Sequence, residues 1–284
     1  GIRDDLVTGV QTCALPILHR LRRIAGPWIL GWFVLGPLCF YMGTLFFAQP
    51  AYYAPNPHYL WFLNNILVYM VLLTPLAAYA VGNGGHSLRR GLATGWRRGY
   101  IPLVALLLFA GEAGIINPKF YTLYFMGPHG WLLGFLCFAL GICCAAGGSD
   151  FRHFVGRFRY VSLAFAFALY MGRVSYYEIE NAPNVLVGME GLLSIGAILG
   201  LATSHLDKTT PFFQYARAAI FPVYILHYPI QFILSYALFP LGLPPTLKLI
   251  LLISGVLLLS VAVYELVLRR VPILRTIFGL ARKE

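Results

Sequence analysis

Long apolar runs separated by short polar segments dominate this sequence. From residue 18 onward, eight of these runs are roughly twenty residues long, which is the length that an α-helix needs to cross a bilayer core of about 30 Å. The predicted spans are residues 28–48, 59–80, 100–117, 130–147, 159–176, 183–203, 216–239 and 246–268. The pattern therefore predicts an all-α fold, a polytopic bundle of transmembrane helices.

The composition supports a membrane protein and excludes an ordinary soluble domain. Hydrophobic residues make up 59% of the chain and charged residues 11%, whereas a soluble domain typically has about 25% charged residues. The net charge of +11 lies in short clusters between the apolar runs rather than on one continuous face, which argues against a nucleic-acid partner. By the positive-inside rule, both termini are predicted to be cytoplasmic and the turn near Pro183 to face outward.

The seventh predicted span carries polar residues on one face. Pro222 and Pro229 lack a backbone N–H, so each frees a carbonyl one turn earlier that needs another hydrogen-bond partner. Tyr224, His227 and Gln231 follow one another at spacings of three and four residues and therefore share one side of the helix. This polar stripe either bonds to neighbouring helices only or lines a cavity.

Charged residues inside the predicted spans are a second candidate for function. At about 1.5 Å per residue, Glu112, Arg173, Glu190 and the uncharged His227 are all expected about 18–21 Å from the cytoplasmic side. Arg173 and Glu190 belong to consecutive spans joined by a short outer turn, so we expect an ion pair between them. The pair is either structural or part of a functional cavity, because intramembrane charges commonly mark substrate or proton sites.

The outer end of the second span adds a histidine and a tryptophan. His58 and Trp61 are three residues apart and share a helical face, and His129 lies at the outer start of a later span. No His-x-x-x-His or Glu-x-x-His spacing occurs, so the sequence predicts no metal site. Imidazole is more commonly used as a general base.

Several motifs in the right order resemble a known family. The segments at 58–63 (HYLWFL), 221–230 (FPVYILHYPI), 263–271 and 274–279 resemble membrane-bound acyltransferase family 3, most closely its branch of glucan-modifying succinyltransferases from bacterial envelopes. Residues 20–27 (RLRRIAGP) resemble the basic motif that precedes the third helix in this family. The resemblance runs from residue 18 to the end of the chain.

The resemblance implies a bundle of about ten helices in the bacterial inner membrane. Such a protein takes an acyl group, acetyl or succinyl, from acyl-CoA and delivers it to a hydroxyl of an envelope glycan; acyl-CoA is a donor substrate, and no bound cofactor is expected. Arg20, Arg22 and Arg23 would neutralise the coenzyme A phosphates.

The resemblance places the family's histidine base and its partner arginine on the first helix, before the region that this chain covers. His227, Tyr224 and His58 are then supporting catalytic candidates. The expected cavity residues are Trp61, Glu112, Arg173, Glu190 and Gln231.

The first seventeen residues differ from the rest. Residues 1–17 have no helical apolar period and resemble translated sequencing-adapter read-through, so they are expected to be non-native, with a truncated acyltransferase domain at 18–284 that is inactive as a fragment. A multi-pass transporter or flippase with midplane charges is the alternative function. Inverted repeats would favour a transporter, but the proline-interrupted span has no counterpart in the first half, which favours the enzyme.

Overall fold

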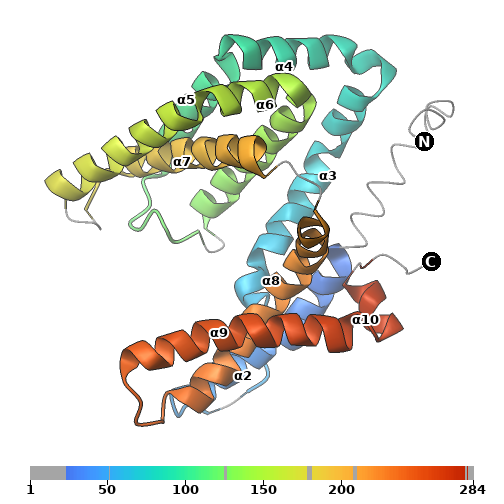
Figure 1. The fold of residues 1–284 in the computed structure, drawn as a ribbon, viewed down its shortest axis with the longest axis vertical. Coiled ribbons are helices and arrows are strands. Elements are labelled where there is room, and N and C mark those ends of the chain that lie inside the picture. The colour runs from blue at the N-terminus through green and yellow to red at the C-terminus, as the bar shows by residue number, and fades with distance from the viewer. Residues whose placement is uncertain are drawn as a thin grey trace. The chain divides into compact units, whose positions relative to one another are not determined.

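The computed structural model describes residues 24–50, 52–124, 127–177, 181–206, 210–278 and 280. In these residues the regular structure is helical and contains no strand, which confirms the all-α prediction (Figure 1). A helical segment begins at Ile24 and continues into η1. The further elements are η1 (Gly31–Leu35), α2 (Gly36–Phe46), η2 (His58–Leu60), α3 (Trp61–Val81), η3 (Asn83–Gly85), α4 (His86–Arg98), α5 (Tyr100–Ile116), α6 (Pro128–Tyr176), α7 (Asn184–His205), α8 (Pro211–Leu238), α9 (Pro245–Val263), η4 (Tyr264–Leu268) and α10 (Pro272–Ile277).

Helices that are long and apolar enough to cross a membrane number six in the described part of the chain, or seven if the bent pair α4–α5 forms one span. The chain is therefore a multi-pass membrane protein. It divides into two compact units, which we call the terminal unit (Gly1–Val68 and Thr209–Glu284) and the central unit (Tyr69–Lys208). The helix α3 contributes its first turns to the terminal unit and the remainder to the central unit.

The terminal unit is built on α8, which packs against α9 and α2 (Figure 1). Apolar side chains from segments far apart in the sequence meet in its core, because each helix must bury part of its surface against a neighbour. The buried members of this core are Leu35, Leu60, Leu63, Ala219, Ile225, Tyr264, Leu268 and Phe278. At the end of the last span, Glu265 forms an exposed ion pair with Arg269, 2.7 Å away and one turn later.

In the central unit, the basic segment between the second and third predicted spans is a helix, α4, rather than the predicted connection. It meets α5 at an angle of 83° across Gly99, whose φ of 78° is a left-handed conformation that glycine adopts without steric cost. Trp96 is buried while Arg97 and Arg98 are exposed, so α4 is amphipathic and basic. This combination is typical of a helix that lies along a membrane surface.

Two of the predicted spans, 130–147 and 159–176, belong to the two arms of α6, a helical stretch of 49 residues. The helix is broken at Gly148, which has non-helical angles of φ 54° and ψ −118°, and its two arms leave this point in different directions (Figure 1). At 1.5 Å per residue, the arms 128–147 and 149–176 are about 30 Å and about 42 Å long, so each can cross a bilayer core of about 30 Å. The two arms therefore correspond to the separate spans predicted at 130–147 and 159–176, and the six candidate helices of the described residues count α6 once.

Candidate functional site

Pro229 has the predicted effect on the backbone of α8. Pro229 has no N–H to donate to the carbonyl of Ile225, four residues earlier. The hydroxyl of Tyr59, which lies in η2, donates a hydrogen bond to this carbonyl instead. The proline thus creates the acceptor that fixes Tyr59 against α8, and Ile225 itself is fully buried.

Around this hydrogen bond, rings from two distant segments form a cluster, which we call the His–Tyr cluster: His58, Tyr59, Tyr224, His227 and Tyr228. The rings of Tyr59 and Tyr228 stack with centroids 4.7 Å apart and an interplanar angle of 19°. The imidazole of His58 lies 5.5 Å from the Tyr228 ring, and that of His227 lies 6.1 Å from Tyr59 and 5.7 Å from Tyr224. The fold therefore brings together the three residues predicted as supporting catalytic candidates.

The hydrogen bonding of His227 sets which of its nitrogens is available. Its Nδ1 lies within hydrogen-bonding distance of the Tyr224 carbonyl oxygen, which can only accept, so Nδ1 carries the proton. The neutral imidazole then presents a lone pair at Nε2. In the described part of the chain, Nε2 makes no hydrogen bond, and the side chain is half-buried. His227 can thus accept a hydrogen bond, and then a proton, from a hydroxyl group.

The other predicted site residues of the terminal unit lie outside the His–Tyr cluster. Gln231 lies one turn beyond His227 on α8 and is half-buried, so it continues the same face. Trp61 is also half-buried, and its ring packs edge-on against Phe62 with centroids 6.2 Å apart. The arginines predicted to bind coenzyme A lie outside the described residues, and their role stays a prediction; they are Arg20, Arg22 and Arg23.

In the central unit, the predicted ion pair between Arg173 and Glu190 is confirmed. Nε of Arg173 lies 2.9 Å from Oε2 of Glu190, and Nη2 lies 3.3 Å from Oε1, which makes the contact bidentate. The side chains are only 11% and 17% exposed. Both carboxylate oxygens accept from the guanidinium, so the two charged groups satisfy each other. The geometry therefore favours the structural interpretation of this pair.

A second buried pair, between Glu112 and His129, was not predicted. Nδ1 of His129 lies 2.6 Å from Oε1 of Glu112, and its Nε2 lies 3.0 Å from the carbonyl oxygen of Tyr121. The His129 side chain is 4% exposed and the Glu112 side chain 1% exposed. Since the carbonyl can only accept, Nε2 is protonated and one further proton lies between Nδ1 and the carboxyl group. The pair is therefore neutral as a whole, which makes its burial tolerable.

The connection between α5 and α6 shields this pair. The ring of Tyr124 stacks on His129, with centroids 5.4 Å apart. Burial, and secondly the Glu112 carboxyl group, raise the pKa of the Tyr121 phenol, so its hydroxyl stays protonated at neutral pH. At the start of α7, the side-chain amide of Asn184 donates to the carbonyl of Pro118 at 2.7 Å. The pair of Glu112 and His129 is thus covered by contacts from within the central unit.

Comparison with known proteins gives the chemical class. A family model for an acyltransferase domain, acyltransferase family 3, matches residues 16–265, a range that contains both segments of the His–Tyr cluster. No curated protein and no solved structure matches the chain. Within the described residues, no group of three or more His, Cys, Asp or Glu side chains could hold a metal ion. The match favours acyl transfer over transport, and the chain belongs to acyltransferase family 3, a family of membrane acyltransferases.

Proposed function

We propose that the protein is an O-acyltransferase of the bacterial inner membrane, which transfers an acetyl or succinyl group from acyl-CoA to a hydroxyl of an envelope glycan. Family membership supports the acyl-transfer class. The observation that carries the proposal is the orientation of His227, whose Nδ1–H is directed to a backbone carbonyl and whose Nε2 is left with an available lone pair. Transfer to a hydroxyl requires an acceptor of this kind for the hydroxyl proton.

In the proposed reaction, the acceptor hydroxyl donates a hydrogen bond to Nε2 of His227. As its oxygen attacks the thioester carbonyl, the proton moves to Nε2, and the C–S bond breaks when the tetrahedral intermediate collapses. The resulting imidazolium returns the proton to the coenzyme A thiolate, so the products are the ester and the free thiol. The half-buried Tyr224 and His58 would orient the acceptor, while Tyr59 is held by its bond to α8.

The donor would enter from the cytoplasmic side. We propose both termini there, so that Arg20, Arg22 and Arg23 meet the coenzyme A phosphates in the cytoplasm. Glycan hydroxyls would approach the outward end of the bundle. Transfer from acyl-CoA on the cytoplasmic side to the glycan on the outer side would then carry the acyl group across the membrane.

The test is acyl transfer by the purified protein in proteoliposomes, with labelled acetyl-CoA or succinyl-CoA and an envelope glycan. A longer family member with helices ahead of the matched region is assayed in parallel, because the resemblance places the family's base there. His227→Ala, made in this chain and at the matching position of the longer family member, should reduce the rate per mole of folded protein by roughly a hundredfold or more in whichever protein is active, as for other acid–base residues. Thermal stability in detergent should be unchanged, since a half-buried neutral group is removed.

The matched control is His205→Ala, an exposed histidine at the end of α7, which should retain full activity. Normal activity of His227→Ala would return the polar face of α8 to a packing role. Transfer from neither thioester by any of the proteins would refute acyl-CoA as the donor.

A further inference from the structure

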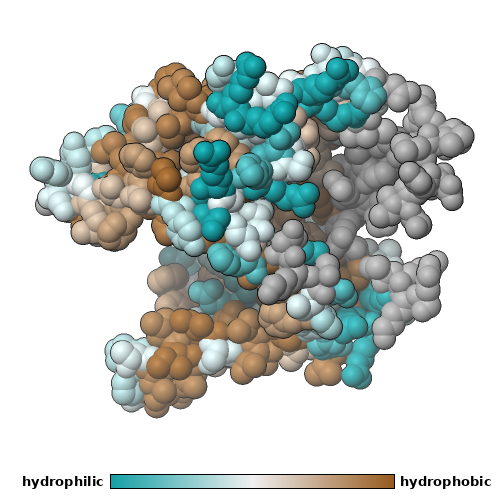
Figure 2. Space-filling model, turned by 45° about the horizontal axis from the view of Figure 1, so that its top comes forward, coloured by the Kyte–Doolittle hydropathy of each residue, from teal (hydrophilic) through white to brown (hydrophobic). Residues whose placement is uncertain are grey.

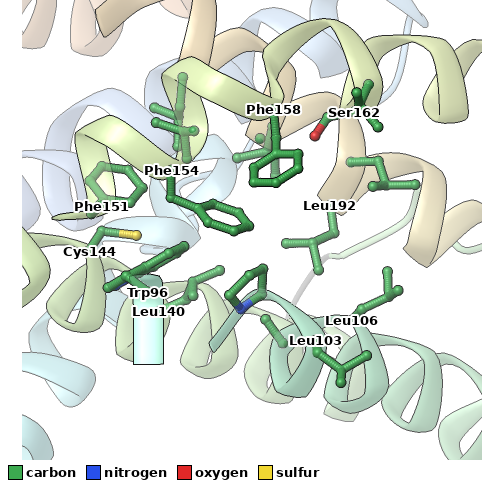
Figure 3. Close-up of a pocket in the computed structure, with 18 of the residues that line it drawn as sticks. Trp96, Leu103, Leu106, Leu140, Cys144, Phe151, Phe154, Phe158, Ser162 and Leu192 are labelled. Atoms are coloured by element: carbon green, nitrogen blue, oxygen red, sulfur yellow. The ribbon is translucent and has the colours of Figure 1, made fainter. Parts of the chain in front are cut away.

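The central unit contains an apolar pocket that the proposed acyl transfer does not use. It lies between α4, α5, both arms of α6 and α7, and its volume is about 270 Å³. Figure 3 shows Phe154 and Phe158 of α6 on one side and Leu103 and Leu106 of α5 on the other. The lining is almost entirely hydrocarbon, with few heteroatoms, such as the hydroxyl of Ser162.

The shape of the pocket suits a hydrocarbon chain. On the second arm of α6, its lining runs from Phe151 to Phe165, which is about 21 Å along the helix at 1.5 Å per residue. This exceeds half of a bilayer core of about 30 Å, the depth of one leaflet. The volume is just below the roughly 300–1,000 Å³ of sites for drug-sized ligands. A nucleotide or sugar would leave its polar groups without partners here, whereas a single extended acyl chain would not.

Two exposed arginines directly follow one residue of the pocket lining in the sequence. Trp96 lines the pocket and donates a hydrogen bond of 3.0 Å from its Nε1 to the carbonyl of Cys143, and Arg97 and Arg98 follow it on α4. Both arginines are exposed, and Arg97 has an acidic neighbour, Asp150, at 3.8 Å. Exposed basic residues lie on α4 and near the bend of α6, among them Arg90, Arg97, Arg98 and Arg152, and Figure 2 shows hydrophilic surface on the side of the molecule that comes forward from the top of Figure 1.

This arrangement pairs an apolar slot with cations on an amphipathic helix. Exposed arginines on such a helix attract anionic lipid headgroups, while the zwitterionic headgroups of other lipids gain less. We propose that the pocket binds one acyl chain of an anionic phospholipid from the cytoplasmic leaflet, with its phosphate held by Arg97 and Arg98. The lipid would join α4 to the arms of α6 and is a ligand additional to the acyl donor and the glycan.

Trp96 supplies the measurement, because brominated acyl chains quench the fluorescence of a tryptophan that they touch. The full chain is reconstituted with brominated phosphatidylglycerol or brominated phosphatidylcholine at equal fractions. The part of the fluorescence quenching that disappears in Trp96→Phe reports acyl chains in the pocket. This part should be larger with brominated phosphatidylglycerol than with brominated phosphatidylcholine. Trp131→Phe, which removes a tryptophan outside the pocket lining, should leave this preference unchanged.

Two further variants separate chain binding from charge recognition. Ser162→Phe fills the pocket and should reduce Trp96 quenching by both lipids. The double change Arg97→Gln and Arg98→Gln, at exposed positions that tolerate substitution, should reduce the anionic preference by roughly fivefold per arginine. Arg270→Gln, an exposed arginine of the terminal unit, should leave it unchanged.

Three results would overturn the proposal. Equal quenching of Trp96 by the two lipids in the unaltered protein, or a preference that survives the loss of both arginines, would remove the anionic recognition. Unchanged quenching in Ser162→Phe would place the chain outside the pocket. Displacement of the lipid by long-chain acyl-CoA but not by added phospholipid would assign the pocket to the acyl donor.

Discussion

Breaking the ion pair between Arg173 and Glu190 should lower the free energy of unfolding by about 3–5 kcal/mol, the range for a buried pair that loses one partner. The two contacts of 2.9 Å and 3.3 Å and the low exposure of 11% and 17% place this pair in that class. At an effective dielectric constant of about 20, unit charges about 3 Å apart interact by roughly 5 kcal/mol. The charge left behind keeps its desolvation penalty and loses most of this attraction.

The assay is chemical unfolding in detergent of Arg173→Ala, Glu190→Gln and the double variant. The double variant should be more stable than the sum of the single effects predicts, with a coupling free energy of at least about 1.5 kcal/mol. The control is Glu265→Gln, which breaks an ion pair whose side chains are 34% and 39% exposed and should change stability by less than about 1 kcal/mol. If Arg173→Ala were no more destabilising than this control, the buried pair would contribute nothing to the fold.

Three further predictions follow from the other contacts. Tyr59→Phe leaves the Ile225 carbonyl of α8 without a donor and should lower the free energy of unfolding by about 1–3 kcal/mol in thermal unfolding. Adding Pro229→Ala to this variant should restore much of the lost stability, because the alanine returns a backbone N–H. A lack of rescue would contradict the assignment of Tyr59 as the donor that replaces this N–H. Glu112→Leu should destabilise by a similar amount, while Glu112→Gln, whose amide can donate to Nδ1 of His129, should be milder; equal effects would refute the shared proton. A reporter inserted near Pro183 should be periplasmic and one at the C-terminus cytoplasmic, and inverted labelling would refute the topology.

The hydropathy pattern located the apolar helices well but misjudged their connections. Because a hydropathy window counts apolar side chains, it reads a basic segment as a break whether or not the backbone remains helical. For this reason α4, with Arg97 and Arg98, and the stretch that joins the two arms of α6 were both predicted as connections. The actual breaks fall at Gly99 and Gly148, where the backbone angles and not the polarity change.

Among the site residues, the pairs that could be predicted are those close in the chain. Arg173 and Glu190 lie on helices joined by a short turn, so opposite charges at similar depth were sufficient evidence for their ion pair. The pairing of Glu112 with His129 had a comparable signal, a carboxylate one turn before the end of α5 and an imidazole at the start of α6. It was missed because each residue was considered by its depth and not by the turn between them.

The sequence by itself determined that this is an all-α membrane protein, where its apolar spans lie, and that Pro229 leaves a carbonyl without its helical donor. These properties depend on composition and local chain geometry, which a linear pattern contains. Only the tertiary structure decided that Tyr59, 166 residues away from Ile225, supplies the missing donor, that His58 joins the rings of α8, and that the four helices α4 to α7 line an apolar pocket. Such contacts depend on how distant helices pack, and many packings are compatible with the same pattern of apolar and polar residues.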